Sequence, residues 1–326
     1  MSRSAVITWS PSVTLVPTRA CFNACGYCGF RRPVRPEELA GAAPADNLSD
    51  ATARQQLASR PGAREVLLLS GELPPGSGGR AAWFARLRRL SQLALAAGRL
   101  PHTNAGPLSR REMAALGRLN PSLGLMLEGL GAAFEQLHRG APSKRLDLRL
   151  AQLEQAGRLG IPFTTGLLLG VGEQAGERRD ALRLIALLQR RWGHIQEVIL
   201  QPWRPGGAAP APLPAGLLNG LLTTVAEARR ILPPEVHLQL PPNLWPADRL
   251  GEALEAGIDD LGGIDSGDVI NPAYPQPAPP QLARLLERQG WRLQPRLCVH
   301  RHWIPWLPSP LRRRAEAIAQ ALAGAG

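Results

Sequence analysis

The sequence lacks the features of a membrane or secreted protein. No apolar run approaches the ~18 residues that cross a bilayer, and polar residues interrupt the N-terminal stretch before any signal-peptide core can form. Only four cysteines are present, and three of them lie within eight positions, a spacing that suits a metal site better than a disulfide framework. We therefore expect a cytoplasmic protein with no membrane partner.

Lysine is almost absent too. Of the 38 basic residues, Lys144 is the only lysine, and the net charge of +12 comes from scattered arginines. Segments such as RAAWFARLRRL place these arginines on amphipathic stretches, and no run of five or six like charges occurs. This pattern is typical of solvated helix faces, so nucleic acid is not an expected partner.

The composition is otherwise that of a folded protein, with 326 residues and 44% hydrophobic content. Short apolar runs alternate with amphipathic helical patterns along most of the chain. The runs predict strands at 13–16, 66–69, 100–103, 122–127, 161–169, 195–200, 236–240 and 258–261. Such alternation predicts parallel strands joined by right-handed crossovers.

We therefore predict an α/β fold, a (β/α) TIM-type barrel that is either a partial six-strand barrel or near-complete. Residues 1–245 would form the barrel core, and residues 246–326 would complete the barrel and cap it. Barrel enzymes carry their chemistry on the loops that follow the strands. Motifs at strand ends are therefore the candidate site.

The strongest motif follows the first predicted strand. Cys21, Cys25 and Cys28 have the spacing C-x3-C-x2-C. Three thiolates can hold three irons of a cubane cluster and leave the fourth iron open to a small molecule. Tyr27, directly before the last cysteine, would shield such a cluster on one side.

A structural zinc site is the alternative for these cysteines. Its fourth ligand would be Cys298, which His300 and His302 flank, or another of the six histidines. Zinc modules usually contain two closely spaced ligand pairs, and a second cysteine pair is absent here. A zinc-dependent, basic nucleic-acid-binding protein therefore stays open as a second alternative function, whereas Cys298 is otherwise expected to pack in the core.

The cysteine spacing after the first strand resembles the radical S-adenosylmethionine (SAM) superfamily. Longer stretches resemble one family within it, the CofG-type subunits that form the deazaflavin 7,8-didemethyl-8-hydroxy-5-deazariboflavin (FO). These stretches are TLVPTRACFNACGYCGFRRP, PHTNAGPLSRREMAALGRLNPSLGLMLEG, IPFTTGLLLGVGE and IQEVILQ. The resemblance runs in order from about residue 6 to about residue 275, and it implies a [4Fe-4S] cluster with SAM as cosubstrate.

The resemblance also implies which residues bind SAM. Ser70, Gly71 and Glu72 would receive the methionine amino group, and Glu128 and Arg149 would contact the ribose hydroxyls and the methionine carboxylate. Gly170, Val171 and Gly172 would lie along the adenine. This chain departs from the family in having LPPG after Glu72 and Pro202 after Gln201.

Polar residues at other strand ends are candidates for binding the substrate. They are His102, Thr103 and Asn104 after the third strand, Thr164 and Thr165 in the fifth, and Gln201 after the sixth. Their side chains suit a ribityl chain, a uracil ring and a phenol. No residue is assigned a catalytic step from the sequence.

By this resemblance the chain is a radical SAM lyase of the ammonia-lyase type that makes FO from a coupled tyrosine–ribitylaminouracil intermediate. One cysteine triad implies a separate sibling subunit that makes this intermediate from tyrosine, and a one-electron donor such as ferredoxin or flavodoxin. The first alternative is a sibling radical SAM enzyme that acts on tyrosine or on an aminofutalosine-type substrate.

Overall fold

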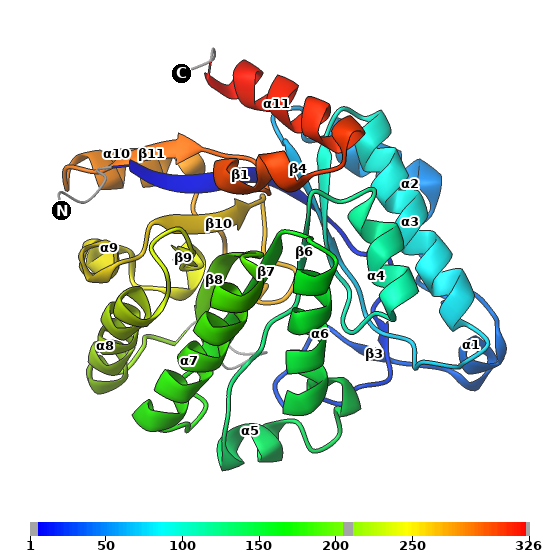
Figure 1. Cartoon of the computed structure of the whole chain (residues 1–326), viewed down its shortest axis with the longest axis horizontal. Helices are drawn as coiled ribbons and strands as arrows, with labels where there is room; N and C mark the ends of the chain where they lie inside the picture. Colours follow the sequence, from blue (N-terminus) through cyan, green and yellow to red (C-terminus); the bar gives the residue numbers. More distant parts are fainter. Residues whose placement is uncertain (1–5, 205–210, 324–326) are drawn as a thin grey trace.

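A closed barrel of eight parallel strands forms the centre of the computed structural model, which describes residues 6–204 and 211–323 (Figure 1). In ring order the strands are β1 (Val6–Leu15), β4 (Glu65–Leu69), β5 (Leu100–Asn104), β6 (Ser122–Gly124), β7 (Phe163–Leu169), β8 (Ile195–Pro202), β9 (His237–Gln239) and β10 (Asp260–Ile264). Pairing of β10 with β1 closes the ring. The predicted TIM-type barrel is confirmed, and all eight of the predicted strands are present.

Helices surround the barrel on its outside. They are α2 (Asp50–Ala58), α3 (Arg80–Ala96), α4 (Arg110–Gly117), α6 (Leu146–Arg158), α7 (Ala175–Trp192), α8 (Ala215–Ile231), α9 (Leu250–Ala256) and α10 (Pro279–Glu287). Their ends follow local sequence signals. Ser49 accepts the Thr52 N–H at the start of α2, and Gly193 ends α7 in the left-handed conformation that glycine favours.

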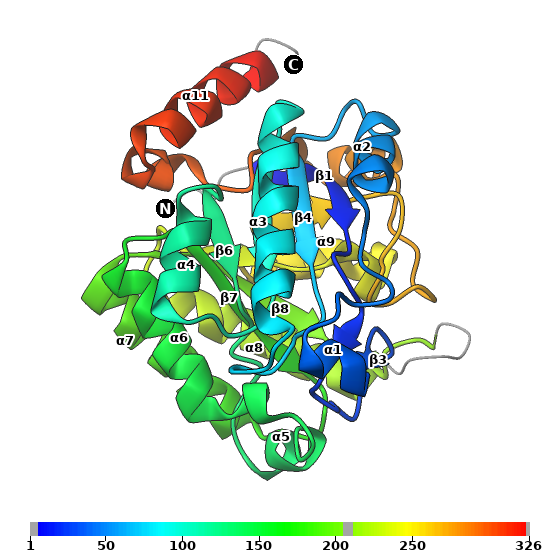
Figure 2. The same cartoon turned by 90° about the vertical axis from the view of Figure 1, so that its right-hand side faces the viewer.

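Shorter elements occupy the two ends of the barrel. At the carboxyl end lie β2 (Ala20–Cys21), β3 (Arg32–Pro33), α1 (Pro36–Ala40), α5 (Ala132–Leu137), η1 (Pro142–Lys144), η2 (Pro242–Leu244) and η3 (Ala247–Arg249). At the opposite end lie β11 (Arg292–Pro295), η4 (Arg301–Trp306) and α11 (Ser309–Ala323). Figures 1 and 2 show α11 at one end of the molecule, with α1 and α5 at the other.

The segment from β11 to α11 covers the amino end of the barrel. β11 extends alongside the first half of β1, and the chain after it packs Leu297, Val299 and Trp303 against Leu100 at the start of β5. Burial of these apolar side chains removes the barrel floor from water. The interior is therefore open only toward the carboxyl ends of the strands.

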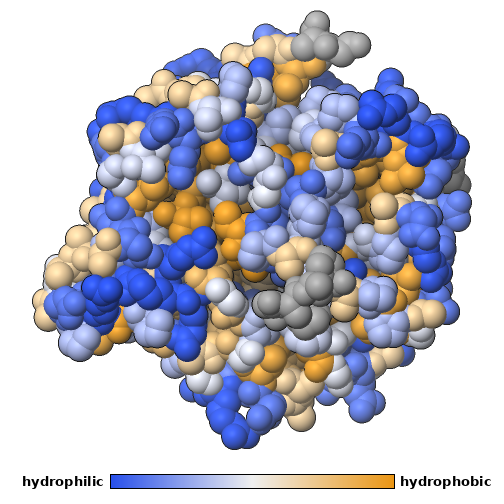
Figure 3. Space-filling model, turned by 180° about the vertical axis from the view of Figure 1, so that it is seen from behind, coloured by the Kyte–Doolittle hydropathy of each residue, from blue (hydrophilic) through white to orange (hydrophobic). Residues whose placement is uncertain are grey.

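The face opposite to that of Figure 1 is mostly polar. Seen from behind, hydrophilic residues dominate and hydrophobic residues form smaller patches between them (Figure 3). Within the described residues, no helix has the length and apolarity needed to cross a bilayer.

Candidate functional site

A single cavity of about 340 Å³ connects the cysteine loop with the barrel interior. Thirteen of the residues predicted from the sequence line it. They are Cys21, Cys25, Tyr27, Cys28, Ser70, Gly71, Glu72, His102, Asn104, Glu128, Arg149, Thr164 and Gln201. The structure therefore brings residues from six barrel strands and the segments that follow them to one site.

The three clustered cysteines lie in a loop that is fixed at both ends of the motif. Cys28 N–H donates to Cys25 O, and the backbone of Ala24 pairs with Gly140 beyond α5. Burial raises the pKa of the Cys25 thiol to about 11, and the neighbouring thiols of Cys28 and Cys21 contribute to this rise. The three thiols are therefore close enough to interact electrostatically.

The donor set of this loop fits an iron–sulfur cluster. Three thiols lie on one short loop at the cavity, and thiolates are the ligands that hold such clusters. Cys298, the proposed fourth zinc ligand, lies at the opposite end of the barrel, where its thiol faces Leu100 O at 3.8 Å.

The segment Ser70–Gly71–Glu72 runs beside the cysteine loop. Gly71 N–H donates to Thr18 O, and Phe22 N–H donates to Glu72 O. A Cβ at Gly71 would lie 2.2 Å from Ala20 O, so only glycine allows this close approach. The residue type that the sequence singled out is thus required for packing the strand end against the cysteine loop.

Glu128 occupies a strained position at the cavity wall. Its φ of 76° is the one positive value among the described non-glycine residues, a conformation that costs on the order of 1 kcal/mol or more. Backbone hydrogen bonds to Gly166 and Leu168 hold it there. Its carboxylate accepts from Tyr27 Oη at 3.1 Å and is ion-paired with Lys144.

Charges around Glu128 keep it ionised. Burial works to raise its pKa, but Lys144 and Arg149 hold that pKa below its ordinary value. Burial likewise works to lower the pKa of Lys144, yet Glu128 and Tyr27 raise it. The pair therefore presents one buried carboxylate and one partly buried ammonium at the cavity.

Arg149 is almost completely buried, with 2% of its surface exposed. Its Nε donates to Ser143 O at 2.7 Å, and Nη1 donates to Met126 O at 3.0 Å. Two backbone carbonyls thus orient the guanidinium at the cavity wall. A surface-helix arginine would not be held in this way.

Five predicted residues do not line the cavity. Gly170, Val171 and Gly172 form the turn after β7, where the Glu173 carboxylate accepts the N–H groups of Gly170 and Val171. The Thr103 hydroxyl donates to Asn120, and the Thr165 hydroxyl accepts from Leu127 N–H. Strand alternation explains the threonines, because successive side chains point to opposite faces and the neighbours His102 and Thr164 face inward.

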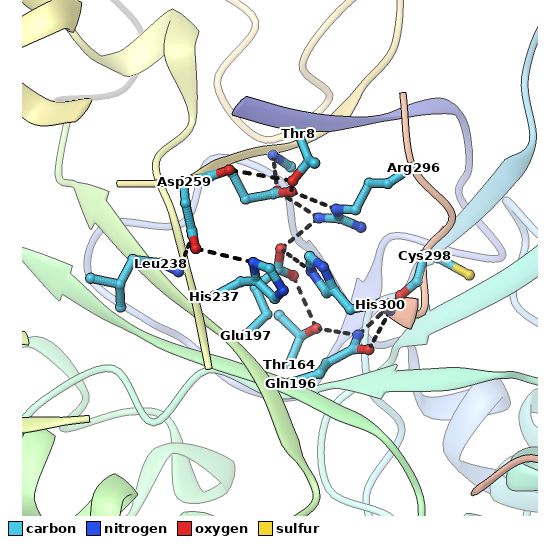
Figure 4. Close-up of polar contacts among 12 residues, drawn as sticks. Thr8, Thr164, Gln196, Glu197, His237, Leu238, Asp259, Arg296, Cys298 and His300 are labelled. Atoms are coloured by element: carbon cyan, nitrogen blue, oxygen red, sulfur yellow. Dashed lines mark hydrogen bonds and ion pairs between the residues drawn. The ribbon is translucent and has the colours of Figure 1, made fainter. Parts of the chain in front are cut away.

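The inner end of the cavity is charged, whereas barrel interiors are usually filled by branched apolar side chains. Arg296, which follows β11, donates to both Asp260 oxygens at 2.5 and 2.6 Å and to Glu197 at 2.5 Å (Figure 4). Thr164 donates to Glu197 at 3.1 Å. Glu65, at the start of β4, also lines this end, and burial raises its pKa to about 7.

A guanidinium already occupies the position that a cation would take at this end. Possible metal-ligand atoms of Glu197, Asp260 and His300 all lie within 4.8 Å of one another. Arg296 bonds both of the carboxylates. The two acids are therefore both ion-paired with one internal arginine.

Sequence analysis missed several charged residues that line the site, among them Lys144, Glu65, Glu197 and Arg296. Lys144 carried a usable signal, because it is the only lysine in a chain whose other basic residues are arginine. Glu197 lies within the stretch IQEVILQ and could have been found there, whereas Glu65 and Arg296 are isolated charged residues outside the recognised motifs. Cys298 was expected in the core and is indeed buried.

Comparison with known families agrees with this geometry. A model of the radical SAM superfamily matches residues 15–185. A protein of Gloeobacter violaceus named 7,8-didemethyl-8-hydroxy-5-deazariboflavin synthase is 51% identical over 99% of this chain and 96% of its own length. A protein of the same name from Synechococcus elongatus is 50% identical over 97% of this chain and 93% of its own length.

Solved structures share the fold at much lower identity. The FeFe-hydrogenase maturase HydG from Carboxydothermus hydrogenoformans matches with a TM-score of 0.69 and 17% identity, covering 96% of this chain and 77% of its own. Methylornithine synthase (PylB) matches with a TM-score of 0.60 and 16% identity, covering 89% of this chain and 84% of its own. These likenesses support the barrel architecture alone.

Proposed function

The chain belongs to the radical SAM superfamily and, within it, to the family of 7,8-didemethyl-8-hydroxy-5-deazariboflavin synthases, and we propose that it catalyses the ring-closing reaction of deazaflavin formation. The substrate is 5-amino-5-(4-hydroxybenzyl)-6-(D-ribitylimino)-5,6-dihydrouracil. The products are FO, ammonia, 5′-deoxyadenosine and methionine. The identity of about 50% to relatives of that name over nearly the full chain carries this proposal.

The outer part of the cavity would bind the cofactors. Cys21, Cys25 and Cys28 would hold the [4Fe-4S] cluster, and Glu128 and Arg149 would bind SAM. When bound, these groups supply one-electron cleavage of the cosubstrate and, through it, abstraction of a carbon-bound hydrogen. A fixed guanidinium suits a carboxylate, because its fork can form two parallel hydrogen bonds.

The residues of the strand end after β4 would bind the amino group of the SAM methionine. Ser70, Gly71 and Glu72 offer backbone carbonyls and a carboxylate close to the cysteine loop, and both groups attract an ammonium. Gly170, Val171 and Gly172 stay a proposal for the adenine, at the turn after β7. The Glu173 carboxylate would hold this turn in one conformation.

The inner part of the cavity would bind the substrate. His102, Asn104, Thr164 and Gln201 face it and can exchange hydrogen bonds with hydroxyl and N–H groups. The closed amino end of the barrel would keep bulk water away from the reacting carbon. Exclusion of water matters because it removes side reactions of a reactive intermediate.

The single cysteine triad has a consequence for partners. One triad provides one radical site, so a sibling enzyme would have to couple tyrosine to the ribitylaminouracil. A small electron carrier such as ferredoxin or flavodoxin would supply the electron. We propose that both act on this chain as separate proteins.

The test is a substrate comparison with the anaerobically reconstituted full chain, SAM and a reductant. Supplied with the coupled intermediate, the enzyme should form fluorescent FO and ammonia. Supplied with tyrosine and the ribitylaminouracil, it should form neither FO nor the intermediate. Formation of the intermediate from tyrosine, with no reaction of the intermediate itself, would move the chain to the tyrosine-consuming alternative.

A further inference from the structure

We propose that His102 is a permanently oriented hydrogen-bond acceptor that recognises an uncharged hydroxyl group of the substrate inside the barrel. Nε2 of its imidazole would be the accepting atom, and Ser122 would be the positioning residue that fixes the tautomer. The identity of the substrate rests on the function proposed above. The assignment of the His102 tautomer does not rest on that function.

A chain of hydrogen bonds determines which nitrogen of His102 carries the proton. Ser122 Oγ lies 2.8 Å from Cys298 O, and a carbonyl oxygen can only accept, so the serine must donate there. His102 Nδ1 lies 2.7 Å from the same Ser122 Oγ. The single hydroxyl hydrogen is already used, so Nδ1 must donate to the serine. Nδ1 is therefore protonated, and Nε2 carries the lone pair.

The acceptor at the start of this chain is held firmly in place. Cys298 O also accepts from Gln196 Nε2 at 3.0 Å, and His300 N–H donates to Gln196 Oε1 at 3.0 Å (Figure 4). The carbonyl of Cys298, in the covering segment after β11, thus accepts hydrogen bonds from both β6 and β8. Ser122 has no other orientation that avoids placing two oxygens 2.8 Å apart without a hydrogen between them.

The lone pair on Nε2 is left uncovered on the cavity side. Within residues 6–204 and 211–323, no side chain or backbone group forms a hydrogen bond with this atom. Gly124 on the neighbouring strand lies beside it, and a Cβ there would come within 2.8 Å of Nε2. Gly124 does not have a positive φ, so the backbone conformation does not require glycine. The absence of a side chain at 124 keeps the acceptor accessible.

The histidine stays neutral under working conditions. Burial, followed by the positive charge of Arg296, lowers the pKa of His102 to about 3. A neutral imidazole with its lone pair in the cavity attracts hydroxyl and N–H donors and offers nothing to a carboxylate. It therefore selects a hydrogen-bond donor of the substrate over a carboxylate. In the proposed substrate, the phenol hydroxyl and the ribityl hydroxyls have this chemistry.

The tautomer can be measured without any substrate. The full chain is prepared with ¹⁵N-labelled histidine and a reconstituted, oxidised cluster, and the His102 signals are assigned by their loss in His102→Asn. We expect a neutral ring protonated at Nδ1, and a mixture of tautomers in Ser122→Ala. A ring protonated at Nε2, or an imidazolium at pH 7, would overturn the assignment.

Two substitutions separate recognition from folding. His102→Asn keeps a donor near the Nδ1 position and lacks an acceptor at Nε2, whereas His102→Gln can place an amide oxygen near the Nε2 position. We expect His102→Asn to raise KM for the coupled intermediate on the order of tenfold, as for a lost hydrogen bond to a buried group. His102→Gln should recover most of this loss. Thr103→Val, on the same strand with its side chain outside the cavity, should leave KM unchanged.

Substrate analogues distinguish the two hydroxyl sources. One analogue lacks the phenol hydroxyl, and another carries an alkyl chain in place of the ribityl group. The ratio of KM between His102→Asn and the parent should fall toward one for the analogue that lacks the recognised hydroxyl. A tenfold ratio that persists with both analogues, or an equal KM in His102→Asn and the parent with the full substrate, would contradict recognition by His102.

Failure of the proposed function would give a different pattern. In that case the parent enzyme would not consume the coupled intermediate at all, and the proposed role of His102 in recognising this substrate would be wrong. The nitrogen spectrum would still decide the tautomer. Gly124→Ala offers a further check, because its methyl group would lie 2.8 Å from Nε2 and should shift the ring signal of His102.

Discussion

Lys144, the only lysine of the chain, is ion-paired with Glu128 at the wall of the cavity, and its Nζ also donates to Tyr27 Oη at 3.2 Å. Every other basic residue in the sequence is arginine. A compact ammonium fits between a carboxylate and a phenol where a planar guanidinium needs more room. The position therefore favours lysine against the general composition of the chain.

Removing this ammonium should destabilise the protein. Lys144→Met leaves Glu128 buried with an uncompensated charge, which typically costs about 3 to 5 kcal/mol. We expect a clear fall in the denaturant midpoint of Lys144→Met. The double variant Glu128→Gln with Lys144→Met should recover much of the loss, because neither charge of the pair remains. Equal destabilisation of the single and double variants would show that Lys144 does not stabilise the protein by compensating the charge of Glu128.

The carboxyl group of Glu65 predicts a dependence of stability on pH. Its pKa is about 7 in the folded protein and 4.5 ordinarily, so above pH 4.5 the unfolded chain releases a proton that the folded chain retains. The stability that Glu65 contributes is fully present below pH 4.5 and is lost as the pH rises to about 7. The loss in the free energy of unfolding is on the order of 3 kcal/mol.

Glu65→Gln isolates that effect, because glutamine is neutral at every pH and resembles the protonated acid. Relative to the parent, the variant should gain thermal stability between pH 5 and pH 8. The measurement is the difference in melting temperature at these two pH values. A difference that is the same at both would show that Glu65 does not titrate in this range.

The cysteines predict a simple difference in metal content. Cys25→Ala should lose the cluster, because only thiolates hold the irons. Cys298→Ala should retain it, since Cys298 lies beside Leu100 at the covered end of the barrel. Iron and sulfide analysis after anaerobic reconstitution decides the matter. Loss of iron in the Cys298 variant would contradict the assignment of an open iron site.

Arg149 should contribute to SAM binding. Arg149→Lys replaces a fork that Ser143 O and Met126 O orient, and one ammonium cannot reproduce it. We expect the SAM affinity, measured by calorimetry on the reconstituted protein, to fall tenfold or more, which corresponds to about 1 to 3 kcal/mol. An affinity within twofold of the parent would contradict a role of Arg149 in SAM binding.

The barrel could be predicted from the sequence because its strands are short apolar runs separated by amphipathic helices. β11 was missed, since Arg292–Pro295 reads RLQP and has no strand pattern. Its pairing depends on the open first half of β1, which only the assembled barrel provides. The sequence-based prediction that residues 246–326 complete and cap the barrel therefore did not include β11 as a strand.

The two ends of the cavity differ in how well the sequence predicted their residues. Residues of the outer end lie in continuous motifs, so resemblance located them. Residues of the inner end, such as Glu65 and Arg296, are 231 positions apart in the numbering and meet only when the barrel closes. Strand alternation also separates inward His102 from outward Thr103, a distinction that strand-end position alone cannot make.

The central claim is that one cavity joins the radical chemistry to the hydroxybenzyl group of the substrate. Ring closure converts the benzylic CH₂ of the intermediate into a ring CH, so a carbon-bound hydrogen of that group must leave. The decisive measurement uses an intermediate whose hydroxybenzyl carbons carry deuterium, and mass spectrometry of the 5′-deoxyadenosine formed with FO. The account predicts 5′-deoxyadenosine one mass unit heavier, in step with FO. Unlabelled 5′-deoxyadenosine alongside full FO formation would contradict it.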